Sequence, residues 1–358
     1  MPEYNLAKKI KGCIIGSAAG SLYGRFVEHS AWRKTFAERM AAAEEFPKKA
    51  GGMAWGAHGV DYNSHMLLIS DAFIAKQGTP TVEETAAKWL KNVDPLRFGD
   101  GDITIKPVAN PIKYAMRNSY ELLSSGAPPR IAGALNVPTN TGLYVCAPSA
   151  AANACDPDQA FLDAVSLASL FQRDRGAVVP GIVAAMTAEA MKQDRTIEDT
   201  AETADRLAGD VAARNTKTGR TDPIHYLVSE ARRNSRNAEN AEALYRRFGK
   251  MTEPSSKRDP HKMLIQTTAI TLFAGGNAEK AVKTAVLDAQ SPDFLGACCG
   301  MICGALEGID AFPSSWIEMV ESLPNGRDFG ETADRLTELL IAGAEKKNRI
   351  AEKILSMG

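Results

Sequence analysis

The chain has no long hydrophobic run and no excess of charge of either sign. No uninterrupted apolar stretch in its 358 residues approaches the roughly 18 that a membrane span needs, so we expect no transmembrane helix. Lysine and arginine total 42 against 43 aspartate and glutamate residues. This balance argues against a protein that binds nucleic acid or an anionic membrane through bulk charge. Because 44% of the residues are hydrophobic, the chain can still bury a sizeable core.

The cysteines lack the spacing of a metal site or a disulfide framework. No CxxC pair is combined with histidine at metal-ligand spacing, and dispersed thiols are typical of a reducing compartment. The N-terminal segment 1–20 has no convincing cleavage site for secretion. We therefore expect a cytoplasmic protein with free, buried thiols. The six cysteines are Cys13, Cys146, Cys155, Cys298, Cys299 and Cys303.

Helical periodicity is present along most of the sequence. The segment 82–93 follows a Thr-Pro-Thr start and carries Glu84 near its first turn, which indicates a capped helix. The segment 156–172 begins with an aspartate cap and a proline at the first helical position. The strand-like alternations are short, as in 102–108, and the Gly-, Pro- and Asn-rich segments 94–112 and 126–142 are expected as loops. The pattern predicts an all-α protein.

Small residues line several of these helices on every face. In 12–24, 181–191 and 295–308, glycine, alanine and cysteine would allow close backbone approach between neighbouring helices. Because such helices occur near both ends of the chain, the termini are expected to close one common core. We therefore predict one compact multi-helix bundle formed by a single domain, 1–358, with 12–24 packed against 295–308 at its centre.

Four segments, in this order, resemble the ADP-ribosylglycohydrolase family. The stretch IKGCIIGSAAGSLYGRFVE (10–28) resembles the family opening G-x-x-x-G-x-A-x-G-D-A-x-G-x-P-x-E. GVDYNSHMLLISDAFIAKQG (59–78) stands where the family has a T-D-D-T motif and then a helix. The segment 145–186 resembles the middle region, and 261–309 resembles the closing region with its G-x-D-x-D-T motif. The resemblance implies an all-α hydrolase fold over nearly the whole chain.

The acidic motifs of that family are strongly altered in this sequence. In the family they hold two magnesium ions beside a glycosidic bond, and hard cations of this kind need several oxygen ligands. The matching positions read Asp61, Tyr62, Asn63 and Ser64, then Ser291, Pro292, Asp293 and Phe294, with Gly20-Ser21 for the opening Gly-Asp. Two or three carboxylates compensate two divalent ions poorly. The sequence therefore favours a site without metal or other cofactor; one weakly held magnesium on Asp61, Asn63 and Asp293 is the alternative.

Of the family carboxylates Asp293 and Glu28 remain, and Asp61 is newly placed in the altered T-D-D-T motif. The resemblance implies catalytic roles for these three. Asp61, Asp293 and Glu28 would activate water and stabilise an oxocarbenium-like transition state. His65 lies four residues after Asp61, so on one helix face a carboxylate could orient its imidazole as a general base. The alternatives are structural: Asp61 as a helix cap, Asp293 as a charge at a helix start, Glu28 as a solvated helix-end residue and His65 as a hydrogen-bonded core residue.

A second set of polar and aromatic residues is predicted to bind the substrate. Tyr62 could stack on a base or sugar, and Asn63, Asn140 and Thr141 could bind hydroxyl or phosphate oxygens. Arg173, where related proteins often have a substrate-lining histidine, could hold a phosphate or carboxylate. The alternative roles of these residues are structural: core packing for the aromatic residue, turn formation for the polar residues of 136–144, and a charged helix end for Arg173.

Two functions remain open at this point. The first is hydrolysis of a ribosyl or related N-glycosidic bond in a small-molecule glycoside or ribosylated substrate. The second is a non-catalytic binding or structural protein that kept the fold and lost the chemistry. The sequence indicates neither nucleic acid nor membrane as a partner, and it leaves self-association into a homo-oligomer open.

Overall fold

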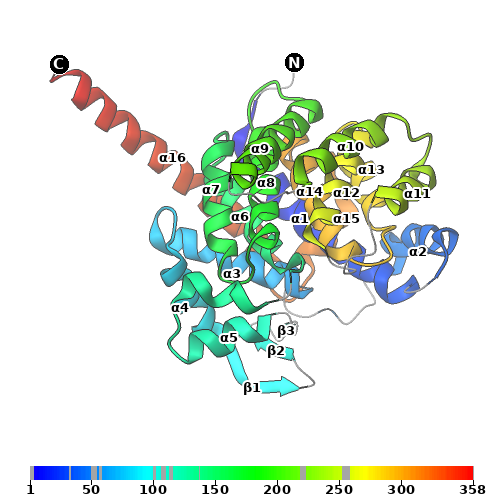
Figure 1. Cartoon of the computed structure of the whole chain (residues 1–358), viewed down its shortest axis with the longest axis horizontal. Helices are drawn as coiled ribbons and strands as arrows, with labels where there is room; N and C mark the ends of the chain where they lie inside the picture. Colours follow the sequence, from blue (N-terminus) through cyan, green and yellow to red (C-terminus); the bar gives the residue numbers. More distant parts are fainter. Residues whose placement is uncertain are drawn as a thin grey trace.

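Helices form nearly all of the structure, a computed structural model that describes residues 4–31, 34–49, 55, 59–99, 102–105, 110–112, 116–136, 138–217, 223–251 and 259–357. The predicted all-α class is confirmed (Figure 1). The first half contains α1 (Leu6–Ala31), α2 (Phe36–Lys49), α3 (Asp61–Lys76), α4 (Val82–Asn92), α5 (Arg117–Ser124), α6 (Cys146–Ala152) and α7 (Pro157–Ala168). The second half contains α8 (Arg175–Ala190), α9 (Ile197–Lys217), α10 (Ile224–Arg236), α11 (Ala241–Met251), α12 (Pro260–Phe273), α13 (Ala278–Ala285), α14 (Pro292–Glu307), α15 (Ser314–Glu321) and α16 (Arg327–Leu355).

Two segments expected as loops contain regular structure. The segment 94–112 contributes to a small antiparallel sheet of β1 (Val93–Gly99), β2 (Asp102–Ile105) and β3 (Asn110–Ile112), in that order. Its register pairs Val93 with Ile105 and Ile103 with Ile112. The segment 126–142 contains the 3₁₀ helix η3 (Pro129–Leu135) and the start of η4 (Asn140–Val145); η5 (Ile309–Ala311) follows α14. Within the part of the chain that the structure describes, no helix has both the length and the apolarity to cross a membrane.

The capping residues predicted from the sequence make capping hydrogen bonds at the starts of α4 and α7. Thr81 and Glu84 bond reciprocally, with the Glu84 amide donating to Thr81 Oγ1 at 3.1 Å and the Thr81 amide to Glu84 Oε2 at 2.9 Å. Asp156 accepts from the Gln159 amide at 3.1 Å, and Pro157 is the first residue of α7. These local interactions satisfy main-chain amides that a helix start leaves without partners. All six cysteines are free, and only Cys155 is not fully buried.

The centre of the bundle is a backbone-to-backbone contact between α1 and α14, as predicted. Glycines recur every fourth residue along α1 and along α14, and the two rows face each other. A Cβ added at Gly20 would lie 2.1 Å from the carbonyl oxygen of Gly296, and one at Gly300 would lie 2.1 Å from that of Gly16. Because real Cβ atoms do not approach an oxygen this closely, glycine alone permits this distance between the helices. The contact fixes which ends of α1 and α14 lie together.

Substituting one of these glycines should therefore destabilise the protein. We expect Gly20→Ala to lower the free energy of unfolding by about 2 kcal/mol or more, because the methyl group must push two backbones apart. Gly249→Ala in α11 is the matched control, since a Cβ there would meet nothing within 4 Å. Its higher helix propensity should leave stability unchanged or raise it by up to about 1 kcal/mol. Equal urea midpoints for Gly20→Ala and the parent would contradict the packing described.

Candidate active site

Three helices bring the selected carboxylates together. Glu28 lies in the last turn of α1, Asp61 is the first residue of α3, and Asp293 is the second residue of α14. The α1–α14 contact places Gly24 of α1 against Pro292 and Asp293 of α14, and α3 packs against α1. The structure thus brings together residues that are up to 265 positions apart in the sequence.

One arginine, which the sequence analysis missed, holds all three carboxylates. Arg25 donates from Nη1 to Glu28 Oε2 at 2.7 Å. Its Nη2 donates to Asp61 Oδ1 at 3.1 Å and to Asp293 Oδ2 at 3.0 Å. Arg25 occupies a variable position of the opening motif, three residues before Glu28 on the same helix face. This i,i+3 spacing of opposite charges is the local pattern from which the Arg25–Glu28 ion pair could have been predicted.

The carboxylate cluster, defined as Arg25, Glu28, Asp61 and Asp293, is largely withdrawn from water. The side chains of Asp61 and Asp293 are 7% and 3% exposed, while those of Arg25 and Glu28 are 31% and 21% exposed. Burial alone would lower the pKa of Arg25, but the charges of Asp293, Asp61 and Glu28 outweigh burial and raise it. Asp61 and Asp293 also stand in the first turns of α3 and α14, where the helix dipole stabilises negative charge.

Tyr144 completes the surroundings of Asp61. It belongs to η4, and its hydroxyl donates to Asp61 Oδ2 at 3.0 Å. Burial, together with the charge of Asp61 and this hydrogen bond, raises the pKa of Tyr144 well above its ordinary value, so the hydroxyl stays protonated and remains a donor. Asp293 Oδ1 in turn accepts from the Phe294 amide at 3.0 Å. Each of the four oxygens on the two buried aspartates therefore has a donor within the protein.

Aromatic rings fill the space on the core side of the cluster. The ring centroids of Tyr62 and Phe294 lie 5.4 Å apart in an edge-to-face arrangement, and Tyr144 lies 5.4 Å from Phe294. Tyr62 is fully buried, and its hydroxyl accepts from Ser17 Oγ at 3.2 Å. The predicted role of Tyr62 in stacking on a substrate has no exposed ring face to support it. These rings stand at two positions where the family has ligand-bearing residues.

His65 is arranged as a core residue. Its Nδ1 lies 2.8 Å from the main-chain carbonyl oxygen of Asp61, so this nitrogen carries the proton and donates. The imidazole stacks on the Tyr144 ring with centroids 4.3 Å apart and is 1% exposed. The sequence predicts that the Asp61 carboxylate orients this ring, whereas in the structure His65 Nδ1 donates to the Asp61 main-chain carbonyl oxygen. The geometry matches the structural alternative.

The predicted substrate-binding residues fall into two groups. Asn63, Asn140 and Thr141 are buried; Asn140 Nδ2 donates to Ser291 Oγ at 3.0 Å, which ties η4 to the residue before α14. Thr141 Oγ1 accepts from Gln172 Nε2 at 2.7 Å. Arg173, by contrast, has a side chain 59% exposed and pairs with Asp174 at 3.8 Å. In this turn Gln172 faces inward, whereas the sequence pattern predicts a binding role for its charged neighbour Arg173.

The residues present do not fit the pair of magnesium ions that the family resemblance implies. Divalent magnesium binds oxygen ligands, preferably carboxylates, in an octahedral shell. In this structure a guanidinium stands among the three carboxylates, and aromatic side chains replace other ligand positions. Among the described residues, no three acidic, histidine or cysteine side chains are close enough together to hold a metal ion. The positive charge that faces these carboxylates is supplied by Arg25.

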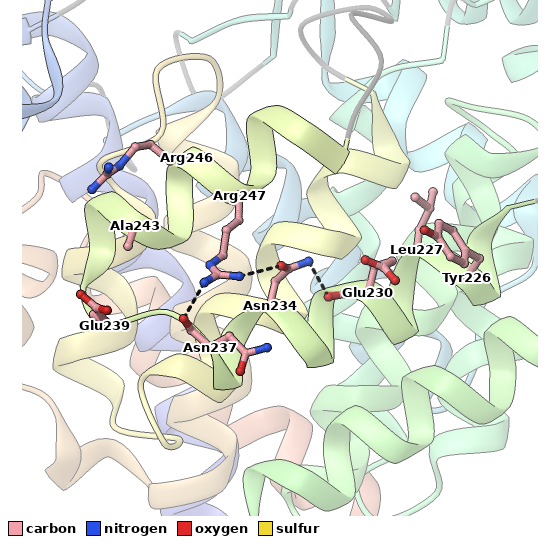
Figure 2. Close-up of a pocket in the computed structure, with 9 residues that line it drawn as sticks. All are labelled: Tyr226, Leu227, Glu230, Asn234, Asn237, Glu239, Ala243, Arg246 and Arg247. Carbon is pink, nitrogen blue, oxygen red and sulfur yellow. Dashed lines mark hydrogen bonds between the residues drawn. The ribbon is translucent and has the colours of Figure 1, made fainter.

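A groove lies elsewhere on the molecule, away from the carboxylate cluster. About 710 Å³ in volume, it is bounded by α10 and α11, and Figure 2 shows its polar lining. Arg247 crosses it, donating to the Asn237 carbonyl oxygen at 2.8 Å and to Asn234 Oδ1 at 3.5 Å. Its lining includes none of the carboxylate cluster, and its central side chains are bonded to one another. We assign this groove no role.

Comparison with known proteins identifies the family. The family model described as ADP-ribosylglycohydrolase matches residues 2–347, so the chain belongs to the ADP-ribosylglycohydrolase family. A solved structure titled "ADP-ribosylglycohydrolase-related protein complex" is similar in fold, with a TM-score of 0.63 and 18% sequence identity. The alignment covers 94% of this chain and 99% of that one. No curated protein matches the sequence.

The ion pairs of Arg25 give the first prediction for this site. We expect Arg25→Ala to lower the free energy of unfolding by about 3–5 kcal/mol, because Asp61 and Asp293 would remain buried without their counter-charge. The exposed Arg335→Ala is the matched control and should change stability by less than about 0.5 kcal/mol. Adding Asp293→Asn to Arg25→Ala should recover part of the loss, so the two substitutions should be clearly non-additive in urea unfolding.

Magnesium distinguishes this arrangement from an intact metal site. Ligand binding to the native state alone stabilises by about 2.7 kcal/mol at a hundredfold excess over Kd. Millimolar magnesium should leave the Tm of the parent unchanged. It should raise the Tm of Arg25→Ala, in which the carboxylates lack a cation. A rise of several degrees in the parent, abolished by Asp293→Ala, would contradict the assignment.

Tyr144 predicts a pH dependence. The native state keeps the Tyr144 proton at pH values where an unfolded tyrosine, with a pKa of about 10, loses it. The unfolded state then binds fewer protons, so stability is retained below about pH 10 and falls above it, by up to about 1.4 kcal/mol per pH unit for each such group. Tyr144→Phe should reduce this slope in urea unfolding, and the exposed Tyr226→Phe should not. Identical slopes for Tyr144→Phe and the parent would contradict the burial and bonding of this hydroxyl.

Proposed function

We propose that this chain is a non-catalytic member of the ADP-ribosylglycohydrolase family that serves as a binding or structural protein. The observation that carries the proposal is the set of three ion pairs made by Arg25. Hydrolysis of a glycosidic bond requires one carboxyl group as acid and a second as base or nucleophile, both able to reach the sugar. In this cluster the carboxylates bind an internal cation instead.

The occupied oxygens of the two aspartates support the same conclusion. A general base must come within hydrogen-bond reach of the water or hydroxyl that it deprotonates. Asp61 is engaged by Arg25 and Tyr144, and Asp293 by Arg25 and the Phe294 amide. Freeing either carboxylate would break a buried charge-assisted hydrogen bond, which is costly in a low-dielectric setting. The buried rings of Tyr62 and Phe294 restrict access from the core side.

A metal-independent N-glycosidase is the second candidate. The observation that favours it is the partial exposure of Arg25 and Glu28, which leaves one side of the cluster open to solvent. A ribosylated small molecule or peptide could approach Glu28 from that side, with Arg25 holding an anionic group. Both candidates are proposed for a cytoplasmic protein, in line with its free thiols.

A glycosidase assay separates the two candidates. Purified protein would be tested, with and without magnesium, on ribosylated small molecules and on ADP-ribosylated arginine and serine peptides, scoring the released aglycone. We expect no turnover above that of a Glu28→Gln/Asp61→Asn/Asp293→Asn variant. Asp61→Asn retains the shape of the side chain, but the triple variant leaves Arg25 without its counter-charges, so its fold would be checked by circular dichroism and urea unfolding before the rates are compared.

Turnover by the parent protein would favour the glycosidase if substitutions in the carboxylate cluster abolished that turnover. General acid–base assistance is worth about 10²–10⁴ in rate, so Glu28→Gln or Asp61→Asn should then lose activity on that scale while remaining folded. Glu321→Gln, an exposed residue in α15, is the matched control and should retain the parental rate. Activity that persists in all cluster variants would indicate a contaminant.

A further inference from the structure

The last helix of the chain extends beyond the body of the protein. At the root of α16, Phe329, Thr332, Ala333 and Leu336 are buried, and this part packs against α1. Every residue from 341 to 357 is exposed. Figure 1 shows this distal half of α16 (red) projecting away from the other helices to its labelled end. The family model ends at residue 347, so most of the projection lies outside the part of the chain that defines the family.

The projecting half of α16 carries large apolar side chains that packing on the body does not cover. Ile350, Ile354 and Met357 are 51%, 59% and 70% exposed. They continue, at alternating steps of four and three residues, the row that is buried at the root of the helix. That row, which we call the apolar stripe, consists of Phe329, Ala333, Leu336, Leu340, Gly343, Lys347, Ile350, Ile354 and Met357. Such spacing is the heptad pattern of a helix that packs along another helix.

A groove at the root of the projection continues this surface. It measures about 400 Å³ and lies between α16 and the ends of α3 and α6. The stripe residues Leu340 and Gly343 line it, with Gln77 and Ala152 on the opposite side. A helix lying along the stripe would therefore meet the body of the protein at this groove. Stripe and groove adjoin, and polar residues such as Lys347 and Gln77 interrupt their apolar side chains.

Charge selects the kind of helix that can cover this surface. Lys347 stands within the stripe, and Lys346 and Lys353 border it on one side, while Ala344 and Ala351 border it on the other. From 346 to 357 the helix has four basic residues and one acidic residue. A parallel second copy would oppose Lys347 to itself, and an antiparallel copy would bring Lys346 near Lys353. Self-pairing thus sets like charges together, whereas a partner with glutamate or aspartate along its edge would neutralise them.

We propose that the distal half of α16 and its root groove form a docking surface for an acidic amphipathic helix of a partner protein. The apolar stripe supplies the contact area, Lys346, Lys347 and Lys353 select the acidic partner, and the alanines on the other edge allow close approach. This proposal does not depend on whether the carboxylate cluster is catalytic, because the two surfaces share no residues.

Binding of designed helical peptides to the full chain tests the proposal. The probe is a labelled three-heptad peptide with isoleucine and leucine in its apolar stripe and glutamate along both edges; the matched peptide has lysine in place of glutamate. Fluorescence anisotropy should show saturable binding of the glutamate peptide, weakened by salt, and no binding of the lysine peptide. Ile350→Glu/Ile354→Glu should weaken binding by at least about tenfold without changing the Tm, since these side chains do not support the body.

Charge reversal supplies the decisive comparison. Lys346→Glu/Lys353→Glu should exchange the preference, so that the lysine peptide now binds and the glutamate peptide does not. Glu345→Lys/Glu352→Lys, on the outer face of the helix, should leave the preference unchanged. Equal binding of both peptides, or no binding of the glutamate peptide, would overturn the proposal. A chain that sediments as a dimer and dissociates in Ile350→Glu/Ile354→Glu would assign the surface to a second copy, and recruitment to phosphatidylglycerol vesicles would assign it to a membrane; either result would overturn the acidic-helix assignment.

Discussion

The candidate site is held together by the ion pairs that the Arg25 guanidinium makes with three carboxylates. The guanidinium joins carboxylates from α1, α3 and α14, and two of them are almost fully withdrawn from water. Buried carboxylates that are not neutralised would push these helices apart or draw water into the core. We propose that the Arg25 side chain supplies the positive charge that magnesium supplies in the family. The aromatic residues Tyr62 and Phe294 stand at two of the family's ligand positions.

The glycine contact between α1 and α14 makes this arrangement possible. Gly24, one residue before Arg25, would place a Cβ 2.1 Å from the Pro292 carbonyl oxygen, so α1 meets the first residue of α14 at backbone distance. Asp293 follows Pro292 directly, and Arg25 therefore reaches its carboxylate at 3.0 Å. The η4 turn then brings Tyr144 to the remaining oxygen of Asp61. The close approach of α1 and α14 thus places Arg25 next to Asp293, and η4 supplies the hydroxyl donor to Asp61.

The sequence predicts the parts of this structure that depend on local or periodic signals. Caps at Thr81 and Asp156 formed as expected, and the small-residue helices at both ends pack together. The carboxylates were found because motif positions match a known family. Arg25 was missed because its partners Asp61 and Asp293 lie 36 and 268 residues away, and no local pattern reports such pairs. The bond of His65 to a backbone carbonyl, and the inward turn of Gln172 instead of Arg173, likewise depend on tertiary contacts that a periodicity cannot show.

A crystal structure grown in the presence of manganese would show whether Arg25 takes the place of a metal among these carboxylates. Manganese binds the same oxygen ligands as magnesium and gives an anomalous signal that locates it. We expect density for the Arg25 guanidinium within hydrogen-bond distance of Glu28, Asp61 and Asp293, with no anomalous peak among these residues. A manganese ion coordinated by Asp61 and Asp293, with Arg25 turned out toward solvent, would contradict this substitution of a side chain for a metal.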